Sequence, residues 1–295
     1  MKYNRLKYSS FTDEKDIAFV PFNESFVANE TLIEKLPEWL TNFRVNYDTI
    51  GFKETISNLP KINGPALIID HPFSGSFERQ AEYLKKYKGV SFCCDRALYK
   101  CLEYDFIPTY VVNVDSSYLC MSFFDRPDVR KVMDKVTAIF ANTTFPLTIR
   151  CWSGRRVFFT PMFEWSITES MSAISRTDIV NTGGCVHNTC LSLAYTLDAD
   201  PITIYGIDNS YDKIEQTEYP DVKHNEYYVE ELGRSFVTDP VYEYYAKKMF
   251  KWISTMKSKV INTTENGIMY NSVSKMLGYD TKITKMKLSE FVRRY

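Results

Sequence analysis

The sequence predicts an α/β protein with a Rossmann-like, mainly parallel sheet and helices on both of its faces. Short apolar runs of strand length alternate with stretches of helical length. The connections are long enough to hold crossover helices, which parallel neighbours require. No tandem repeat, low-complexity tract or linker interrupts the alternation. A chain of 295 residues with 44% hydrophobic residues is also large enough to bury one sizeable core.

The expected elements follow one another through most of the chain. The predicted strands are residues 66–69, 90–94, 110–114, 136–140, 202–205 and 259–262, and the predicted helices are residues 76–87, 95–104, 184–197 and 240–256. We expect residues 1–60 to form an N-terminal extension with an amphipathic helix over 31–47, and residues 61–295 to form the Rossmann-like domain. The polar segment 208–239 is too long for an ordinary connection and indicates a lid or a substrate loop.

Composition and charge exclude several classes of function. The net charge is −1, so a basic surface for binding nucleic acid is not expected. No apolar run reaches the roughly 18 residues of a membrane span, and no secretory signal is visible. Seven scattered cysteines form no C-x-x-C pair, which disfavours a zinc ribbon or a thioredoxin-type site. We therefore expect a soluble cytoplasmic protein, and the sequence leaves homo-oligomerisation open.

Candidate ligand-binding residues follow the predicted strands, because open parallel sheets bind ligands beyond the carboxyl ends of their strands. After the first strand, Ser74, Gly75 and Ser76 offer hydroxyl and N–H groups to a phosphate, although a capped turn explains them equally well. Asp95, Asp115 and Asp208 each follow a later strand. A carboxylate there suits Mg²⁺ or a ribose hydroxyl, and helix or turn capping is the alternative for each.

Two further motifs carry chemistry. Gly183 and Gly184 precede an apolar helix. They let the protein backbone approach a ligand closely, and the helix dipole favours an anion there; a tight turn or close helix–sheet packing is the alternative. His187, just inside that helix, is more readily explained as a structural residue. His224 lies in the polar segment and is a candidate general base, with a solvated surface histidine as the alternative.

Several of these motifs together resemble one family. Residues 181–186 and 200–208 are similar to a G-G-S-V…P-I-x-L-x-G-x-D block, and residues 98–115 and 244–267 resemble two weaker segments in the same order. The family contains the bacterial flagellar motility accessory factors and the archaeal MptE-like 6-hydroxymethylpterin diphosphokinases. The resemblance covers roughly residues 64–290.

The resemblance implies a transferase core related to the bacterial sialyltransferases, which use CMP-activated sugars. Motility accessory factors are linked to transfer of nonulosonic acids to flagellin, whereas the pterin enzymes transfer diphosphate from ATP with Mg²⁺. One segment departs from the pattern. Where the family's first loop reads G-x-G-P-S-L, this chain has residues 70–76 with no early glycine, and the charge of Asp70 should repel a phosphate unless a metal ion or protonation intervenes.

We therefore expect a glycosyltransferase-like enzyme that transfers from a nucleotide-activated donor, such as a CMP-sugar, to a hydroxyl acceptor without a required cofactor. The expected donor-binding residues are Ser74, Gly75, Ser76, Asp95, Asp115, Gly183 and Gly184, and the expected catalytic residues are His224 and Asp208. One alternative is an ATP-dependent pterin diphosphokinase, in which Asp115 and Asp208 hold Mg²⁺. The other is a catalytically silent nucleotide-binding module.

Overall fold

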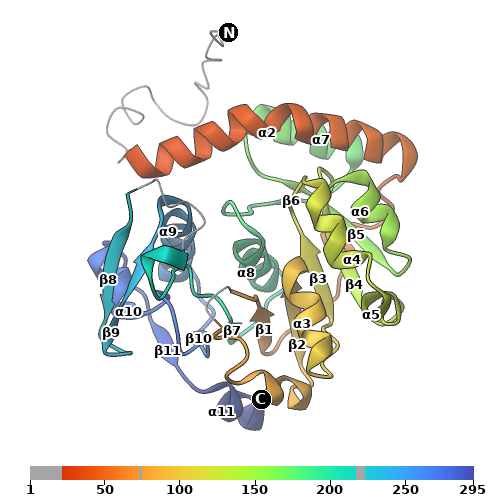
Figure 1. The fold of residues 1–295 in the computed structure, drawn as a ribbon. Coiled ribbons are helices and arrows are strands. Elements are labelled where there is room, and N and C mark those ends of the chain that lie inside the picture. The colour runs from red at the N-terminus through yellow and green to blue at the C-terminus, as the bar shows by residue number, and fades with distance from the viewer. Residues whose placement is uncertain (1–21, 73–74, 217–222) are drawn as a thin grey trace.

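A nine-stranded sheet forms the centre of the molecule (Figure 1). The computed structural model describes residues 22–72, 75–216 and 223–295, with side chains from residue 31 onward. The strand order is β11-β10-β7-β1-β2-β3-β4-β5-β6, and every neighbouring pair is parallel. The strands are β1 (Ala66–Ile69), β2 (Val90–Cys94), β3 (Tyr110–Asn113), β4 (Thr137–Ala141), β5 (Arg156–Pro161), β6 (Ile179–Val180), β7 (Ile202–Tyr205), β10 (Val260–Asn262) and β11 (Ile283–Lys285).

The order of the strands places helices on both faces of this sheet. The chain adds β1 to β6 in one direction and then β7, β10 and β11 in the other, so right-handed crossovers put the two sets of connecting helices on opposite faces. The helices are α2 (Phe22–Thr49), α3 (Leu98–Glu103), α4 (Met121–Phe124), α5 (Pro127–Arg130), α6 (Pro146–Cys151), α7 (Trp165–Ser175), α8 (Val186–Thr196), α9 (Pro240–Thr255), α10 (Asn271–Met276) and α11 (Leu288–Arg294). The predicted α/β class and parallel sheet are confirmed.

The central strands are apolar throughout because both of their faces are covered. All four residues of β1, and all four of β7, are buried. A strand buried on both faces has no need for alternating polar residues, so it reads as a continuous apolar run. This pattern made the central strands predictable from the sequence. Within the described residues, none of the helices combines the length and apolar character needed to cross a bilayer.

Two predicted segments have a different structure. Residues 76–87, predicted as a helix, form turns followed by the 3₁₀ helix η2 (Ala81–Lys86). The polar segment 208–239 is not an irregular loop in its described part. It contains a short 3₁₀ helix, η5 (Ile214–Gln216), and the antiparallel hairpin of β8 (Asn225–Val229) and β9 (Arg234–Thr238). The hairpin reaches stability by packing its buried residues, such as Phe236, into the core.

Helix α2 is docked on the loops that follow β3 and β4. Its side chains Asn42 and Asn46 are buried. Asn42 Nδ2 donates to the carbonyl oxygens of Ser116 and Thr143, both at 3.1 Å. Asn46 Nδ2 donates in the same way to the carbonyl oxygens of residues 142 and 144. Figure 1 shows α2 lying along one end of the molecule, which these bonds identify as the carboxyl end of the sheet.

Candidate functional site

The strand order reverses between β1 and β7, and a narrow pocket lies there at the carboxyl ends of the strands. In open α/β sheets this switch point is where ligands bind. The pocket is lined by Asp70, Pro72, Arg96, His187, Gly206, Ile207, Asp208, Asn209, Ser210, Tyr211 and Tyr242. These residues come from the loops after β1, β2 and β7 and from the first turns of α8 and α9.

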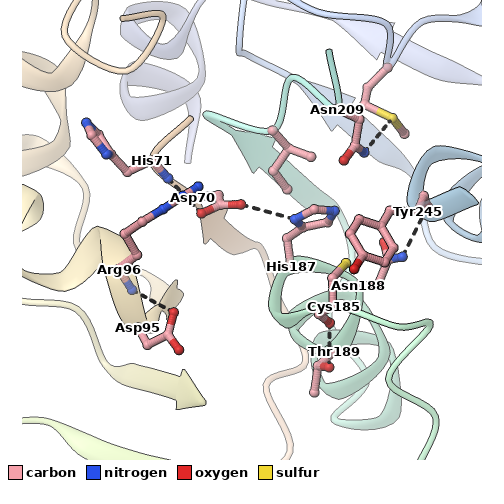
Figure 2. A network of polar contacts seen from close by, with 12 residues as sticks. Asp70, His71, Asp95, Arg96, Cys185, His187, Asn188, Thr189, Asn209 and Tyr245 are labelled. Atoms are coloured by element: carbon pink, nitrogen blue, oxygen red, sulfur yellow. Dashed lines mark hydrogen bonds and ion pairs between the residues drawn. The ribbon is translucent and has the colours of Figure 1, made fainter. Parts of the chain in front are cut away.

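Asp70 and His187 form a buried ion pair in this pocket (Figure 2). The Nδ1 atom of His187 lies 3.0 Å from Oδ2 of Asp70, and the two side chains are 8% and 15% exposed. The other carboxylate oxygen of Asp70 accepts the backbone N–H of His71 at 2.8 Å. Because both partners are largely removed from water, each depends on the other for its charge.

The pair keeps both of its members charged at neutral pH. Burial alone would raise the pKa of Asp70, but the hydrogen bond and charge of His187, with the charge of Arg96, bring it below the usual value. Burial alone would lower the pKa of His187, whereas its interactions with Cys185 and Asp70 raise it to about 10. Burial also opposes the charge on Arg96, and the nearby Asp70 more than offsets this and raises its pKa. The pocket therefore holds two cations beside Asp70.

Asp208 lines the pocket but is held by a network of its own. Its side chain is buried, and its Oδ1 accepts the hydroxyl of Ser76 at 2.9 Å. Its Oδ2 accepts Nδ2 of Asn266 at 2.9 Å. The loop after β10 also passes close to its backbone, and a Cβ added at Gly267 would lie 2.3 Å from the Asp208 carbonyl oxygen. Asp208 is thus fixed in orientation at the wall of the pocket.

The two tyrosines of the pocket wall are positioned by one carboxylate. Asp239 caps α9, because its Oδ1 accepts the backbone N–H groups of Val241 and Tyr242 at 2.8 Å. Its Oδ2 accepts the hydroxyl of Tyr211 at 3.2 Å. The buried Asp239 therefore ties the start of α9 to the segment that follows β7.

Asp95 and Asp115 lie outside the residues that line this pocket. Asp95 is buried, and it accepts the backbone N–H of Arg96 at 2.7 Å and Nδ2 of Asn113 at 2.6 Å. Burial, reinforced by the charges of Asp115 and Asp70, raises the pKa of Asp95 to about 7 against these hydrogen bonds. Asp115 is exposed, and its Oδ1 accepts the N–H of Ser117 in a local turn.

The glycine pair packs against α9. A Cβ added at Gly183 would lie 2.7 Å from the Trp252 ring, and one added at Gly184 would lie 2.9 Å from Tyr244 and 3.0 Å from Tyr245. Both glycines have positive φ. Close packing of α9 thus explains both glycines, and their predicted contact with a donor remains a prediction.

The residues predicted from the first loop and from the polar segment are placed as follows. Ser74 lies outside the described residues, Gly75 is exposed, and the hydroxyl of Ser76 is bonded to Asp208. His224 directly precedes β8 and is half-buried, and its Nε2 has no hydrogen-bond partner in the described parts of the chain. It is not among the residues that line the pocket.

Comparison with known proteins identifies the family of the chain and a solved structure with a similar fold. The model of a family described as 6-hydroxymethylpterin diphosphokinase MptE-like matches residues 38–213, which is more than half of the chain. The chain belongs to this MptE-like family. No curated protein matches it. Among solved structures, the MAf glycosyltransferase from Magnetospirillum magneticum AMB-1 is similar, with a TM-score of 0.62 and 12% identity over 85% of this chain and 38% of that chain. The chain thus spans well under half of that protein, and the likeness shows the shared fold.

The MptE-like name raises the question of a Mg²⁺ site, and the role of Asp115 and Asp208 as its ligands stays a prediction. Asp115 and Asp208 follow β3 and β7, which are separated by β1 and β2. Three strand spacings place these strand ends about 14 Å apart, whereas Mg²⁺ binds its ligands at about 2 Å. Nor do three histidine, cysteine, aspartate or glutamate side chains gather in a metal-binding arrangement anywhere in the described residues.

Sequence reasoning did not identify three of the pocket's charged residues, Asp70, Arg96 and His187, as site residues. Arg96 directly follows Asp95 at the end of β2, and its position after a strand was the signal that could have found it. His187 was interpreted as structural. Its ion pair with Asp70 spans 117 residues of sequence, so no local pattern could reveal it.

Proposed function

We propose that this MptE-like chain is a transferase that uses a nucleotide-activated sugar, of the glycosyltransferase-like type. The observation that carries the proposal is the pocket at the strand switch point, which Arg96 and His187 line. A transfer that releases a nucleoside monophosphate needs positive charge at the departing phosphate. Arg96 and cationic His187 supply that charge from the protein itself.

In this proposal, Arg96 and His187 offset the expected repulsion of a phosphate by Asp70. An unpaired carboxylate in the first loop would oppose a phosphate, but Asp70 is bonded to His187 and lies near Arg96. Arg96 and His187 thus set two cations beside the carboxylate of Asp70, and Asp208 is the second carboxylate of the pocket lining. The role that glycine N–H groups fill in a G-x-G loop is, in this proposal, taken by side-chain cations.

His224 remains our proposed general base for the acceptor hydroxyl. The hairpin supports this proposal through its neighbours. The next residue, Asn225, pairs with Thr238, and the Thr238 hydroxyl donates to the carbonyl oxygen of Asn209 in the pocket wall at 2.9 Å. Asp208, already bonded to Ser76 and Asn266, would orient the substrate.

Replacement of His224 by Ala is expected to lower turnover roughly 100-fold with little change in donor affinity, because a general base contributes about 10²–10⁴ in rate. Steady-state kinetics with saturating donor would measure the turnover, and calorimetric titration would measure the donor affinity. His71→Ala is a matched control, because His71 carries the same ring outside the pocket lining. Full activity of the His224 variant would remove His224 from the mechanism.

A second experiment decides between the enzyme classes. We expect CMP to stabilise the chain in the presence of EDTA, by about 2.7 kcal/mol at 100 times its dissociation constant. We also expect a CMP-sugar to be hydrolysed slowly without added metal. Incubation with ATP, Mg²⁺ and a reduced hydroxymethylpterin should release no AMP.

The diphosphokinase is the second candidate function, because the matching family carries that description. EDTA-sensitive release of AMP in this experiment would establish it and overturn the glycosyltransferase proposal. Binding of CMP with no hydrolysis of any CMP-sugar would instead indicate a catalytically silent nucleotide-binding module.

A further inference from the structure

Helix α8 is preceded by a cysteine whose side chain does not cap the helix. Cys185 is the N-cap residue of α8, in extended conformation, and its thiol makes no hydrogen bond to the N–H groups of the first turn. Its carbonyl oxygen accepts the backbone N–H and the hydroxyl of Thr189 at 3.1 and 2.8 Å, which fixes the backbone at this point. The thiol is half-buried at the positive end of an 11-residue helix.

His187 lies two residues further along the same turn, and one of its nitrogens has no partner. Its Nδ1 is bonded to Asp70, whereas its Nε2 is buried and has no hydrogen-bond partner among the described residues. The side chain as a whole is only 8% exposed. A buried N–H without an acceptor is costly, which points to a group that completes this site.

The side chain of Cys185 interacts with this imidazole and raises its pKa. Figure 2 shows the sulfur atom near the His187 ring, on the side turned away from Asp70. Cys185, His187 and Asp70 therefore lie next to one another. Asp70 orients the imidazole ring of His187, and the ring lies beside the Cys185 sulfur. This is the arrangement in which an imidazolium stabilises a thiolate nucleophile.

The other six cysteines lack these features. Five of them are buried, namely Cys93, Cys94, Cys101, Cys120 and Cys190. Burial raises the pKa of Cys93, Cys94 and Cys120, which keeps these thiols protonated and unreactive. Cys151 is half-buried like Cys185, but burial and the neighbouring Asp125 raise the pKa of its thiol. Cys151 is thus an internal control of similar accessibility.

We propose that Cys185 is a nucleophilic thiol, activated by His187 and by the N-terminus of α8, and that it is a modification site for electrophiles and peroxides. In the reactive form the thiol proton resides on Nε2 of His187. With an alkyl iodide, Sγ bonds to the carbon and iodide leaves with the electron pair. With hydrogen peroxide, Sγ bonds to one oxygen, the O–O bond breaks, and the departing hydroxide takes the imidazolium proton to form water. The cysteine becomes a sulfenic acid and the peroxide is reduced.

The test is the rate at which each cysteine of the intact folded chain reacts with iodoacetamide, followed by peptide mass spectrometry. Cys185 should be alkylated at least about 10-fold faster than Cys151, because thiolate content controls the rate. This comparison needs no variant. An equal or faster reaction at Cys151 would overturn the proposal.

Two variants test the source of the activation. His187→Gln should slow alkylation of Cys185 by roughly 10-fold or more, and Asp70→Asn should slow it less, because the ring remains but loses its orienting partner. His71→Gln is the matched control and should leave the rate unchanged, since the His71 ring contacts Glu78 and only its backbone N–H reaches Asp70. Circular dichroism would confirm that each variant is folded. If Cys185 is alkylated as fast in the folded His187→Gln and Asp70→Asn variants as in the wild type, the proposed activation is wrong.

Discussion

Gly206→Ala is expected to destabilise the protein by about 3 kcal/mol or more and to abolish nucleotide binding. Gly206 has a φ of +71°, and a Cβ there would lie 2.1 Å from the carbonyl oxygen of Asp70. That atom is main chain and cannot move aside without breaking the bond that Asp70 N donates to Tyr205 O at 3.0 Å. The substitution therefore forces apart the ends of β1 and β7, where the pocket lies.

Gly233→Ala is the matched control for this substitution. Gly233 has nearly the same φ, +68°, but no atom lies within 4 Å of its added Cβ. Gly233→Ala should lower the free energy of unfolding only by the strain of an alanine in the left-handed backbone conformation, about 1 kcal/mol. Urea unfolding would measure both losses and a CMP titration would measure binding. Equal losses of unfolding free energy in the two variants would show that the close approach of the β1 and β7 ends at Gly206 adds nothing to the destabilisation.

The second large effect is expected at the ion pair of Asp70 and His187. Asp70→Asn leaves the cation of His187 buried without its partner, and breaking a buried pair in this way costs about 3–5 kcal/mol. The 15% exposure of Asp70 places the expected loss at the lower end of that range. The double variant Asp70→Asn/His187→Gln should recover part of the loss, because no unpaired charge remains. If the single losses simply add in the double variant, the two side chains are not coupled.

The contribution of this pair should depend on pH in a defined window. The pKa of His187 is raised to about 10, so its stabilisation is complete below about pH 6.5 and is lost as the pH rises toward 10. The pKa of Asp70 is lowered, so its stabilisation is present above about pH 4 and is lost on further acidification. The difference in unfolding free energy between the wild type and Asp70→Asn should thus be largest between about pH 4 and 6.5. A difference that grows toward pH 10 would contradict the assignment.

The parallel sheet was predictable because its central strands are buried on both faces. The 66–69 and 202–205 runs are apolar throughout, and the structure has β1 and β7 over the same residues. The strands β5 and β6 were not predicted. β5 holds the apolar run 157–159 but ends at Pro161, a residue that is rare inside strands, and β6 has only two residues. Both lie toward the β6 end of the sheet, and a strand as short as β6 carries no periodic pattern.

The candidate site was predictable in its place and only partly in its residues. The rule that ligands bind at strand carboxyl ends identified Asp208 and the segment after β1. It could not tell that Asp70 is compensated by a histidine 117 residues away. Nor could it tell that Asp95 lies beside Asn113 and not in the pocket. Such pairings arise when distant segments meet, and no spacing in the sequence encodes them.

The docking of α2 bears on which positions of this chain can vary. Asn42 and Asn46 donate only to main-chain carbonyl oxygens in the loops after β3 and β4. Any residue in those loops presents the same carbonyl oxygens, so the helix recognises the path of the loop and not its side chains. Docking of α2 therefore sets no requirement of its own on the side chains of these loops, and two amides are enough to keep the helix in register.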